Sequence, residues 1–151
     1  MYRGRHIWGA IQALKTEQIE ASFDETRGLL LVKYRGKLLS VVTNQFYAWL
    51  MANMKANPEK VTEARGSIYD FRDVTDFEID NLSAPQQGSK QLTSQSDVTG
   101  HPVALIVNDI YQEGMVKLSM QLTEQQDRKR IVKSTDEAVA FIDNWYKEHS
   151  T

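Results

Sequence analysis

The sequence predicts a single α/β domain with a mostly parallel, five-stranded sheet, and three observations favour this class. Residues 19–23 alternate apolar and polar, residues 29–35 are rich in β-formers, and the turn-forming residues 24–28 join them, which predicts a hairpin. After the hairpin, strand and helix patterns alternate, as in right-handed βαβ crossovers. Residues 103–107 form a continuous apolar run, which is typical of a strand covered on both faces.

The N-terminal residues 1–17 are expected to form a tail or helix ahead of the main domain, which covers residues 18–151. Ile7, Ile11 and Leu14 are spaced by four and three residues, which places them on one face of a helix. We expect this helix to pack on its own domain or on a second subunit. A segment lying on a membrane surface is the alternative, but its apolar face is small for that role.

The first crossover helix follows the hairpin. Gly36 is expected to end the second hairpin strand, and Thr43 can cap the helix. The helix is expected to end near Asn57 and Pro58. Its buried stripe is expected to comprise Phe46, Trp49, Leu50, Asn53 and Met54.

In the middle of the chain, the sequence predicts a short strand at residues 67–72, an acidic loop at residues 73–80 and a polar helix at about residues 82–96. That helix has few apolar residues to bury, so we expect it to be the least stable part of the fold. After the apolar strand at 103–107, a long helix is expected at residues 110–126. Its buried stripe is expected to comprise Tyr111, Met115, Leu118 and Leu122.

The last strand is expected at residues 129–133 and leads into a capped helix. Ser134 and Glu137 have the spacing of a capping box, in which each side chain binds a free backbone N–H of the first turn. The helix that follows is expected to bury Ala138, Phe141, Ile142 and Trp145.

This order of elements, and several local patterns, resemble the STAS family, also called SpoIIAA-like, which includes the anti-sigma-factor antagonists. Residues 69–75, Tyr-Asp-Phe-Arg-Asp-Val-Thr, are similar to its third strand. Residues 103–107 with Asn108 and Asp109, followed by Gly114 and Met115, are similar to its fourth strand and the helix that follows. Residues 134–138, Ser-Thr-Asp-Glu-Ala, are similar to the start of the closing helix in short bacterial members.

The resemblance covers about residues 18–146 and implies a SpoIIAA-like βα superhelix. It also implies a regulatory role, because phospho-regulated members carry a phosphorylated Ser or Thr at the helix start after the third strand. Ser83 is the equivalent position and the candidate phosphosite, although residues 80–85 lack the paired hydroxyls and the glycine of that motif. Ser83 also fits a capping box with Gln86. The related CRAL-TRIO lipid-transfer fold implies an alternative, a small-molecule or lipid carrier.

The candidate binding site lies at the carboxyl ends of the parallel strands, where open α/β sheets bind ligands. Its expected members are Asp73, Thr75, Asp76, Asp80, Ser83, Asn108 and Asp109. The carboxylates of Asp70, Asp73, Asp76, Glu78 and Asp80 suggest a hard-cation site. Their spacing does not match a calcium loop, however, so we expect a solvated acidic loop and neither a metal nor a cofactor.

Composition narrows the classes of function. A formal net charge of −2 gives no overall attraction for phosphate backbones, so nucleic-acid binding is not expected. The absence of cysteine excludes thiolate chemistry and disulfides, and it favours a cytoplasmic location. The apolar runs are far shorter than the ~20 residues that span a bilayer. No nucleophile elbow or phosphate-binding loop is present, and His101 is not expected to pair with a nucleophile.

The sequence therefore favours a non-catalytic regulatory or protein-binding module that acts on a protein partner. A homodimer is the expected assembly, because it is the commonest closed one. The lipid or small-molecule carrier stays as the alternative, since aromatic and methionine side chains could line a cavity. A hydrolase or metal enzyme is the third hypothesis.

Overall fold

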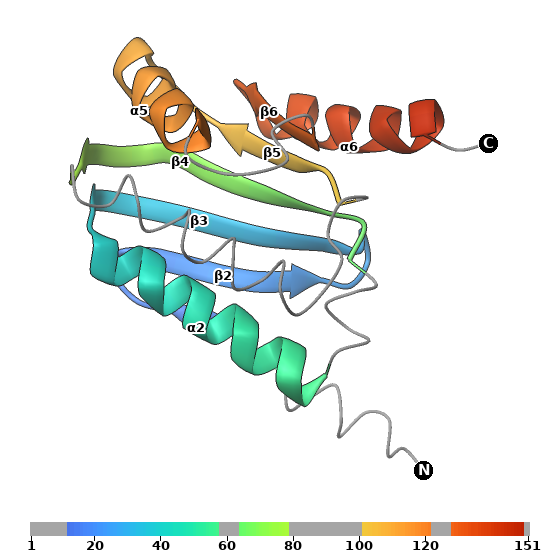
Figure 1. Ribbon diagram of the computed structural model, residues 1–151, viewed down its shortest axis with the longest axis horizontal. Helices are drawn as coiled ribbons and strands as arrows, with labels where there is room; N and C mark the ends of the chain where they lie inside the picture. Colours follow the sequence, from blue (N-terminus) through green and yellow to red (C-terminus); the bar gives the residue numbers. More distant parts are fainter. Residues whose placement is uncertain (1–11, 58–63, 79–100, 122–127, 150–151) are drawn as a thin grey trace.

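The computed structural model describes residues 12–57, 64–78, 101–121 and 128–149, which form a six-stranded sheet and three helices. The strands lie side by side in chain order (Figure 1). They are β1 (Leu14–Lys15), β2 (Ile19–Asp24), β3 (Leu29–Leu38), β4 (Gly66–Phe77), β5 (Val103–Ile106) and β6 (Lys129–Val132). The helices are α2 (Ser40–Ala56), α5 (Ile110–Gln121) and α6 (Thr135–His149).

The sheet is mixed rather than mostly parallel. β1, β2 and β3 pair antiparallel, whereas β3, β4, β5 and β6 pair in parallel. The predicted hairpin start and the alternation of strands and helices are confirmed, and β1 is the strand that the sequence did not predict. Leu14, expected on a helix, lies in β1 opposite Ala21, while Ile7 and Ile11 lie outside the described residues.

The central strands are longer than predicted. Gly36 does not end β3, because its φ of 70° is a conformation that glycine adopts without strain, at a shift in the β3–β4 register. β3 therefore continues to Leu38, where it pairs with Phe77 at the end of β4. Residues 73–77, expected in an acidic loop, are thus the second half of a strand. The side chains of Val74 and Phe77 are buried, which anchors this extension to the core.

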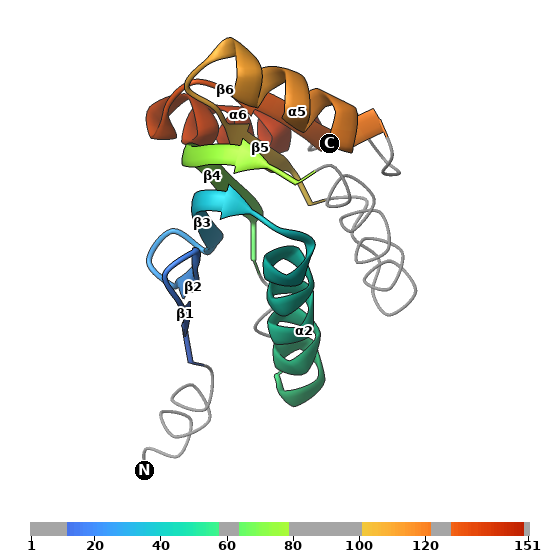
Figure 2. The ribbon, with the colours of Figure 1, turned by 90° about the vertical axis from the view of Figure 1, so that its left-hand side faces the viewer.

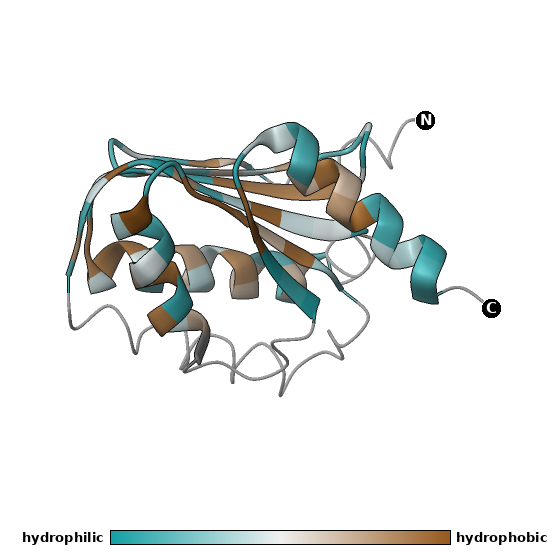
Figure 3. Cartoon of the chain, turned by 90° about the horizontal axis from the view of Figure 1, so that it is seen from above, coloured by the Kyte–Doolittle hydropathy of each residue, from teal (hydrophilic) through white to brown (hydrophobic). Residues whose placement is uncertain are grey.

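Helices cover both faces of the sheet (Figure 2). On one face, Phe46 of α2 and Val116 of α5 belong to the same apolar cluster, and on the other face Ile142 of α6 belongs to a second cluster. β5 contributes Leu105 to the first cluster and Ile106 to the second, which confirms the prediction of a strand buried on both faces. Apolar residues line the strands and the inner helix surfaces, whereas the last turns of α6 are hydrophilic (Figure 3).

α2 largely matches its sequence pattern. It begins at Ser40, with Leu39 at the cap position, so Thr43 lies inside the helix and is buried rather than capping it. The helix ends at Ala56, with Asn57 at the C-cap position, close to the predicted end near Asn57 and Pro58. The predicted stripe is confirmed for Phe46, Leu50, Asn53 and Met54, which are buried, while Trp49 is partly buried.

The face of α5 that packs on the sheet was predicted only in part. Met115 packs against the core, as predicted, and Leu122 lies outside the described residues. Tyr111 and Leu118, expected to be buried, are 46% and 47% exposed, whereas Gln112 and Val116 are buried. Each residue turns an α-helix by about 100°, so this difference is a rotation of roughly one residue. Hydrogen bonds made by Gln112, described below, explain why this rotation is preferred.

α6 follows its predicted capping box. The N–H of Glu137 donates to Ser134 Oγ at 3.1 Å, and Glu137 Oε1 accepts a hydrogen bond from the N–H of Lys133 at 3.3 Å. Ala138, Ile142 and Trp145 are buried, as predicted, and Phe141 is partly buried. The polar helix predicted at about residues 82–96 lies outside the described residues. None of the described helices is long and apolar enough to cross a membrane.

Candidate functional site

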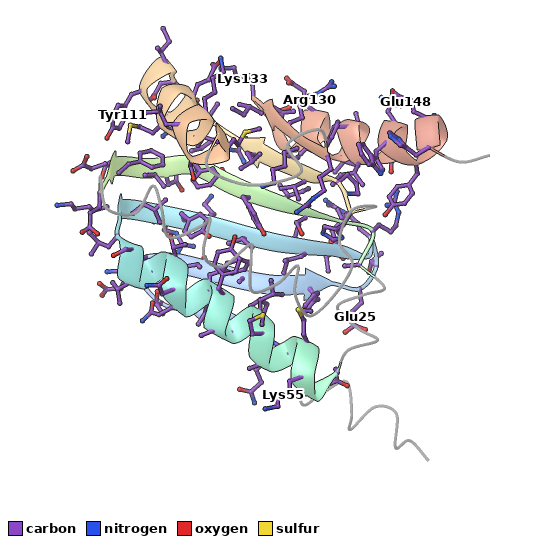
Figure 4. All side chains as sticks on the ribbon, viewed as in Figure 1. Glu25, Lys55, Tyr111, Arg130, Lys133 and Glu148 are labelled. Atoms are coloured by element: carbon purple, nitrogen blue, oxygen red, sulfur yellow. The ribbon has the colours of Figure 1, made fainter. Side chains whose placement is uncertain are left out.

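The carboxyl ends of β3, β4 and β5 lie at one end of the sheet, from which α2 and α5 begin (Figure 1). We call this region the carboxyl edge and define it as residues 38–41, 74–78 and 107–112. Tyr111 marks it in Figure 4, while Glu25, in the turn between β2 and β3, lies at the opposite end. This is the position at which open α/β sheets carry their binding sites.

The Gln112 side chain of α5 binds backbone carbonyls of β4 where β4 has no neighbouring β5 residue. β4 extends well beyond the end of β5, so the carbonyls of Arg72 and Val74 have no β5 residue opposite them. Gln112 Nε2 donates to both carbonyls, at 3.1 and 2.9 Å. Its Oε1 accepts the N–H of Asn108 at 2.6 Å, and the side chain is 2% exposed. Gln112 therefore fixes both the rotation of α5 and the path of the chain into it.

The first turn of α5 is tied to the end of β4. Asp109 Oδ1 accepts the N–H of Gln112 at 2.8 Å, which caps the helix. The Tyr111 hydroxyl donates to Asp76 Oδ1 at 3.0 Å and accepts the N–H of Phe77 at 3.1 Å. The rings of Tyr111 and Phe77 meet edge to face, with centroids 5.7 Å apart. Asp109 and Gln112 have the spacing of a capping box, the one sequence signal that could have found Gln112.

The first turn of α2 is tied to the same strand. Glu78 Oε1 accepts the N–H of Ser40 at 3.2 Å, and the N–H of Glu78 donates to the carbonyl of Leu38 at 3.0 Å. Leu39 has no side-chain oxygen with which to cap the helix, so Glu78 supplies a carboxylate at its positive end. Both helix starts are therefore held in fixed positions relative to the end of β4.

The carboxyl edge exposes apolar side chains next to carboxylates. Val41, in the first turn of α2, is 55% exposed, and Ile110, the first residue of α5, is 88% exposed. Tyr111 is 46% exposed, and Asp76 and Asp109 are also exposed. Exposed apolar side chains in the same region as carboxylates are suited to contact with another macromolecule.

The sequence predicted some of these residues. Asp76, Asn108 and Asp109 lie at the carboxyl edge around the first turn of α5. Thr75 is exposed on β4 next to Asp76. Asp80 and Ser83 lie outside the described residues, so their placement, and the phosphosite at Ser83, remain predictions.

Asp73 lies within β4, and not at its carboxyl end as predicted, because β4 continues to Phe77. Its Oδ2 pairs with Lys33 Nζ at 3.2 Å. The neighbouring Asp70 accepts hydrogen bonds from Arg72 Nε at 3.0 Å and Nη2 at 2.8 Å. Burial raises the pKa of Asp70, but hydrogen bonds from Arg72 and the charges of Arg72 and Lys33 outweigh burial and lower it. These two carboxylates are thus paired with cations on the sheet.

A partly buried polar pair that the sequence did not predict lies at the opposite end of the sheet. Ser67 Oγ and His101 Nε2 are 2.7 Å apart, and Arg128 Nη1 donates to the carbonyl of His101 at 2.8 Å. Burial, and then the charge of Arg128, lower the pKa of His101 to about 4. Such an imidazole is a weak general base near pH 7. The pair therefore links the amino end of β4 to the residues before β5, at the end of the sheet opposite the carboxyl edge.

No protein-family model matches the sequence, and no curated protein is significantly similar to it. Solved structures do share its architecture. An uncharacterized DUF3478-family protein with a SpoIIAA-like fold from Shewanella loihica is 13% identical, with a TM-score of 0.55 over 87% of this chain and 98% of that one. An anti-sigma factor antagonist from Mycobacterium paratuberculosis is 11% identical, with a TM-score of 0.56 over 86% and 99%.

The protein TM1081, solved by NMR, is 14% identical, with a TM-score of 0.53 over 88% of this chain and 94% of that one. Identities this low establish the shared fold and leave the activity open. They agree with the resemblance that the order of elements and the local patterns predict. The chain therefore has the SpoIIAA-like, or STAS-like, fold.

Proposed function

We propose that the protein is a non-catalytic regulatory module of the cytoplasm that binds a protein partner through its carboxyl edge. The observation that carries the proposal is the exposure of Val41 and Ile110 at the first turns of two helices that start from the same edge. Both turns are held by hydrogen bonds to the end of β4, so the apolar surface is organised before the partner arrives. Such preorganisation lowers the entropic cost of binding.

The charge of the carboxyl edge specifies the chemistry of the partner. Asp76, Glu78 and Asp109 place carboxylates at the carboxyl edge, and Lys37 of β3 lies opposite Asp76 of β4. The complementary partner would insert apolar side chains next to Val41 and Ile110 and would carry lysine or arginine around them. Opposite charges of this kind guide association and fix the orientation of the complex.

The fold supports a regulatory role by analogy. The antagonist from Mycobacterium paratuberculosis is described as acting on an anti-sigma factor, which is itself a protein. The aromatic side chains that suggested a carrier cavity contact one another instead. The ring centroid of Phe46 lies 5.1 Å from that of Tyr47 and 5.6 Å from that of Tyr69. These contacts favour a binding module over a lipid carrier.

The test compares baits that differ at one surface position. The wild-type chain, Val41→Glu and Ala52→Glu would be immobilised in equal amounts and exposed to extract of the native cells. Ala52 is an exposed residue of the same helix outside the carboxyl edge, so it is the matched control. We expect one protein to be retained by the wild type and the control and to be lost with Val41→Glu.

The retained protein would then be purified and titrated against the same variants by calorimetry. A loss of affinity of at least about tenfold for Val41→Glu and Ile110→Glu, with little change for Ala52→Glu, is the expected result. Equal affinity for all variants would place the binding surface elsewhere and refute the proposal.

A further inference from the structure

The rotation of α5 about its own axis buries a polar side chain and leaves apolar ones exposed. Gln112 is 2% exposed, whereas Tyr111 and Leu118 are 46% and 47% exposed. A turn of the helix by about 100° would bring Tyr111 and Leu118 to the sheet and carry Gln112 and Val116 away from it. Met115, which packs against the core, would stay on the sheet side. The apolar pattern of α5 therefore suits a second rotation.

Hydrogen bonds to β4 select the observed rotation. Gln112 Nε2 donates to the carbonyls of Arg72 and Val74 at 3.1 and 2.9 Å, and its Oε1 accepts the N–H of Asn108 at 2.6 Å. All three bonds would break if α5 turned. The net free energy of a few buried hydrogen bonds is of the same order as that of burying the exposed halves of two apolar side chains. The balance between the two rotations therefore depends on Gln112.

The rotation of α5 also determines which side chains the carboxyl edge presents. Ile110 is two positions from Gln112, so it lies about 200° around the helix from the buried side and is 88% exposed. A turn of about 100° would move Ile110 to the flank of the helix. It would also break the hydrogen bond from the Tyr111 hydroxyl to Asp76. The surface described above therefore exists in one of the two rotations.

We propose that Gln112 is the positioning residue of the carboxyl edge. Its hydrogen bonds to β4 hold α5 in the rotation that presents Ile110 and Tyr111, and without them α5 turns by about 100° and buries Tyr111 and Leu118. Because Gln112 is buried, it acts through α5 and not by touching a partner. Its effect on partner binding rests on the function proposed above, whereas the rotation does not.

Thiol labelling reports the rotation, because the chain has no cysteine of its own. Leu118→Cys places a single thiol on the exposed side of α5, and Val116→Cys places one on the buried side. Each would be labelled with a maleimide in the wild-type background and with Gln112→Glu, which keeps the shape of glutamine but, when ionised, has no donor for the two carbonyls. Gln45→Glu, the same substitution at an exposed position of α2, is the matched control.

We expect Gln112→Glu to slow the labelling of Leu118→Cys at least about tenfold, since a buried thiol reacts only when the structure opens, and to speed that of Val116→Cys. Gln45→Glu should change neither rate. Gln112→Ala removes the donors without adding a charge, and it decides the question if circular dichroism shows Gln112→Glu to be unfolded. A helix that is merely loosened would label faster at both positions. Such a result, or an unchanged rate at Leu118→Cys, would overturn the proposal.

Calorimetry with the protein retained by the wild-type bait tests the consequence for binding. The Gln112 variant that turns α5 should bind this protein at least about tenfold more weakly, although residue 112 is not on the surface. Unchanged affinity in a variant whose labelling shows the turned helix would refute the positioning role and leave the proposed function standing. If the wild type retains no protein, the proposed function fails, and the labelling rates still decide the rotation.

Discussion

Gln112 donates to the backbone carbonyls of Arg72 and Val74, in the part of β4 that has no β5 residue opposite it. Replacing it with methionine, which has a similar shape and no donor, should lower the free energy of unfolding by about 2 kcal/mol. Urea denaturation followed by circular dichroism measures the change. Gln45→Met, at an exposed position of α2, is the control, and it should stay within about 0.5 kcal/mol of the wild type. Equal effects of the two substitutions would contradict this role of Gln112.

His101 makes stability depend on pH. Its pKa is about 4 in the folded chain, below the ordinary value of 6.5, so the unfolded chain takes up the proton first. This contribution to stability is therefore complete above about pH 6.5 and is lost as the pH falls towards 4. The loss amounts to at most about 3 kcal/mol. Unfolding free energies measured between these pH values should fall more steeply for the wild type than for His101→Gln, and parallel curves would rule this contribution out.

At the scale of single elements, Gly36 allows β3 to continue and to pair with the whole of β4. Its φ of 70° is unfavourable for residues with a Cβ, although the space around it is open. Gly36→Ala should therefore lower the free energy of unfolding by about 1 kcal/mol through backbone strain alone. Gly36→Asn should lose less, because asparagine tolerates this conformation better. Thermal denaturation of both variants tests this, and a larger loss for asparagine would indicate a steric cause instead.

Elements whose pattern is local could be predicted from the sequence. The hairpin, α2 and α6 follow from turn residues, apolar spacing and the Ser134–Glu137 capping box, all of which act within a few residues. The end of β4 and the rotation of α5 could not be predicted, because each depends on a distant partner. β4 extends because β3 continues past Gly36, and α5 rotates because Gln112 reaches the carbonyls of β4.

The candidate site also contains residues that could be predicted from the sequence and residues that could not. Asp76 and Asp109 were predicted because carboxylates near strand ends are visible in the sequence. The role of Tyr111 was missed, since the spacing that suggests burial cannot show that its hydroxyl binds Asp76 and Phe77 across the edge. Asp73 was predicted at the end of a strand, but it lies within β4, because β3 continues past Gly36 and pairs with β4 as far as Phe77.

At the scale of the whole molecule, the two apolar clusters share the strands between them. Trp49 packs against the cluster of α2 and α5, whereas Trp145 is a buried residue of α6 on the other face. Because β5 contributes to both clusters, we expect one cooperative transition that both of these tryptophans report. The third tryptophan, Trp8, is replaced by Phe so that Trp49 alone is observed. In a background with Trp8→Phe and Trp145→Phe, Ile142→Ala should still shift the fluorescence transition, with a loss of about 2 to 5 kcal/mol.

Circular dichroism of the same variant should give the same midpoint as fluorescence. Ala140→Ser, at an exposed position of α6, is the control and should leave the midpoint unchanged. If Ile142→Ala leaves the midpoint of the fluorescence transition unchanged, the two faces unfold independently.

The outermost strands of the sheet have a consequence for how copies of this chain meet in a crowded solution. β1 has two residues and β6 has four, and Lys15, Lys129 and Arg130 place positive charge along them. Short, charged margins are poor templates for adding a foreign backbone, so growth into fibrils by strand recruitment is disfavoured. Contacts between molecules are therefore expected to use the helical surfaces rather than the margins of the sheet.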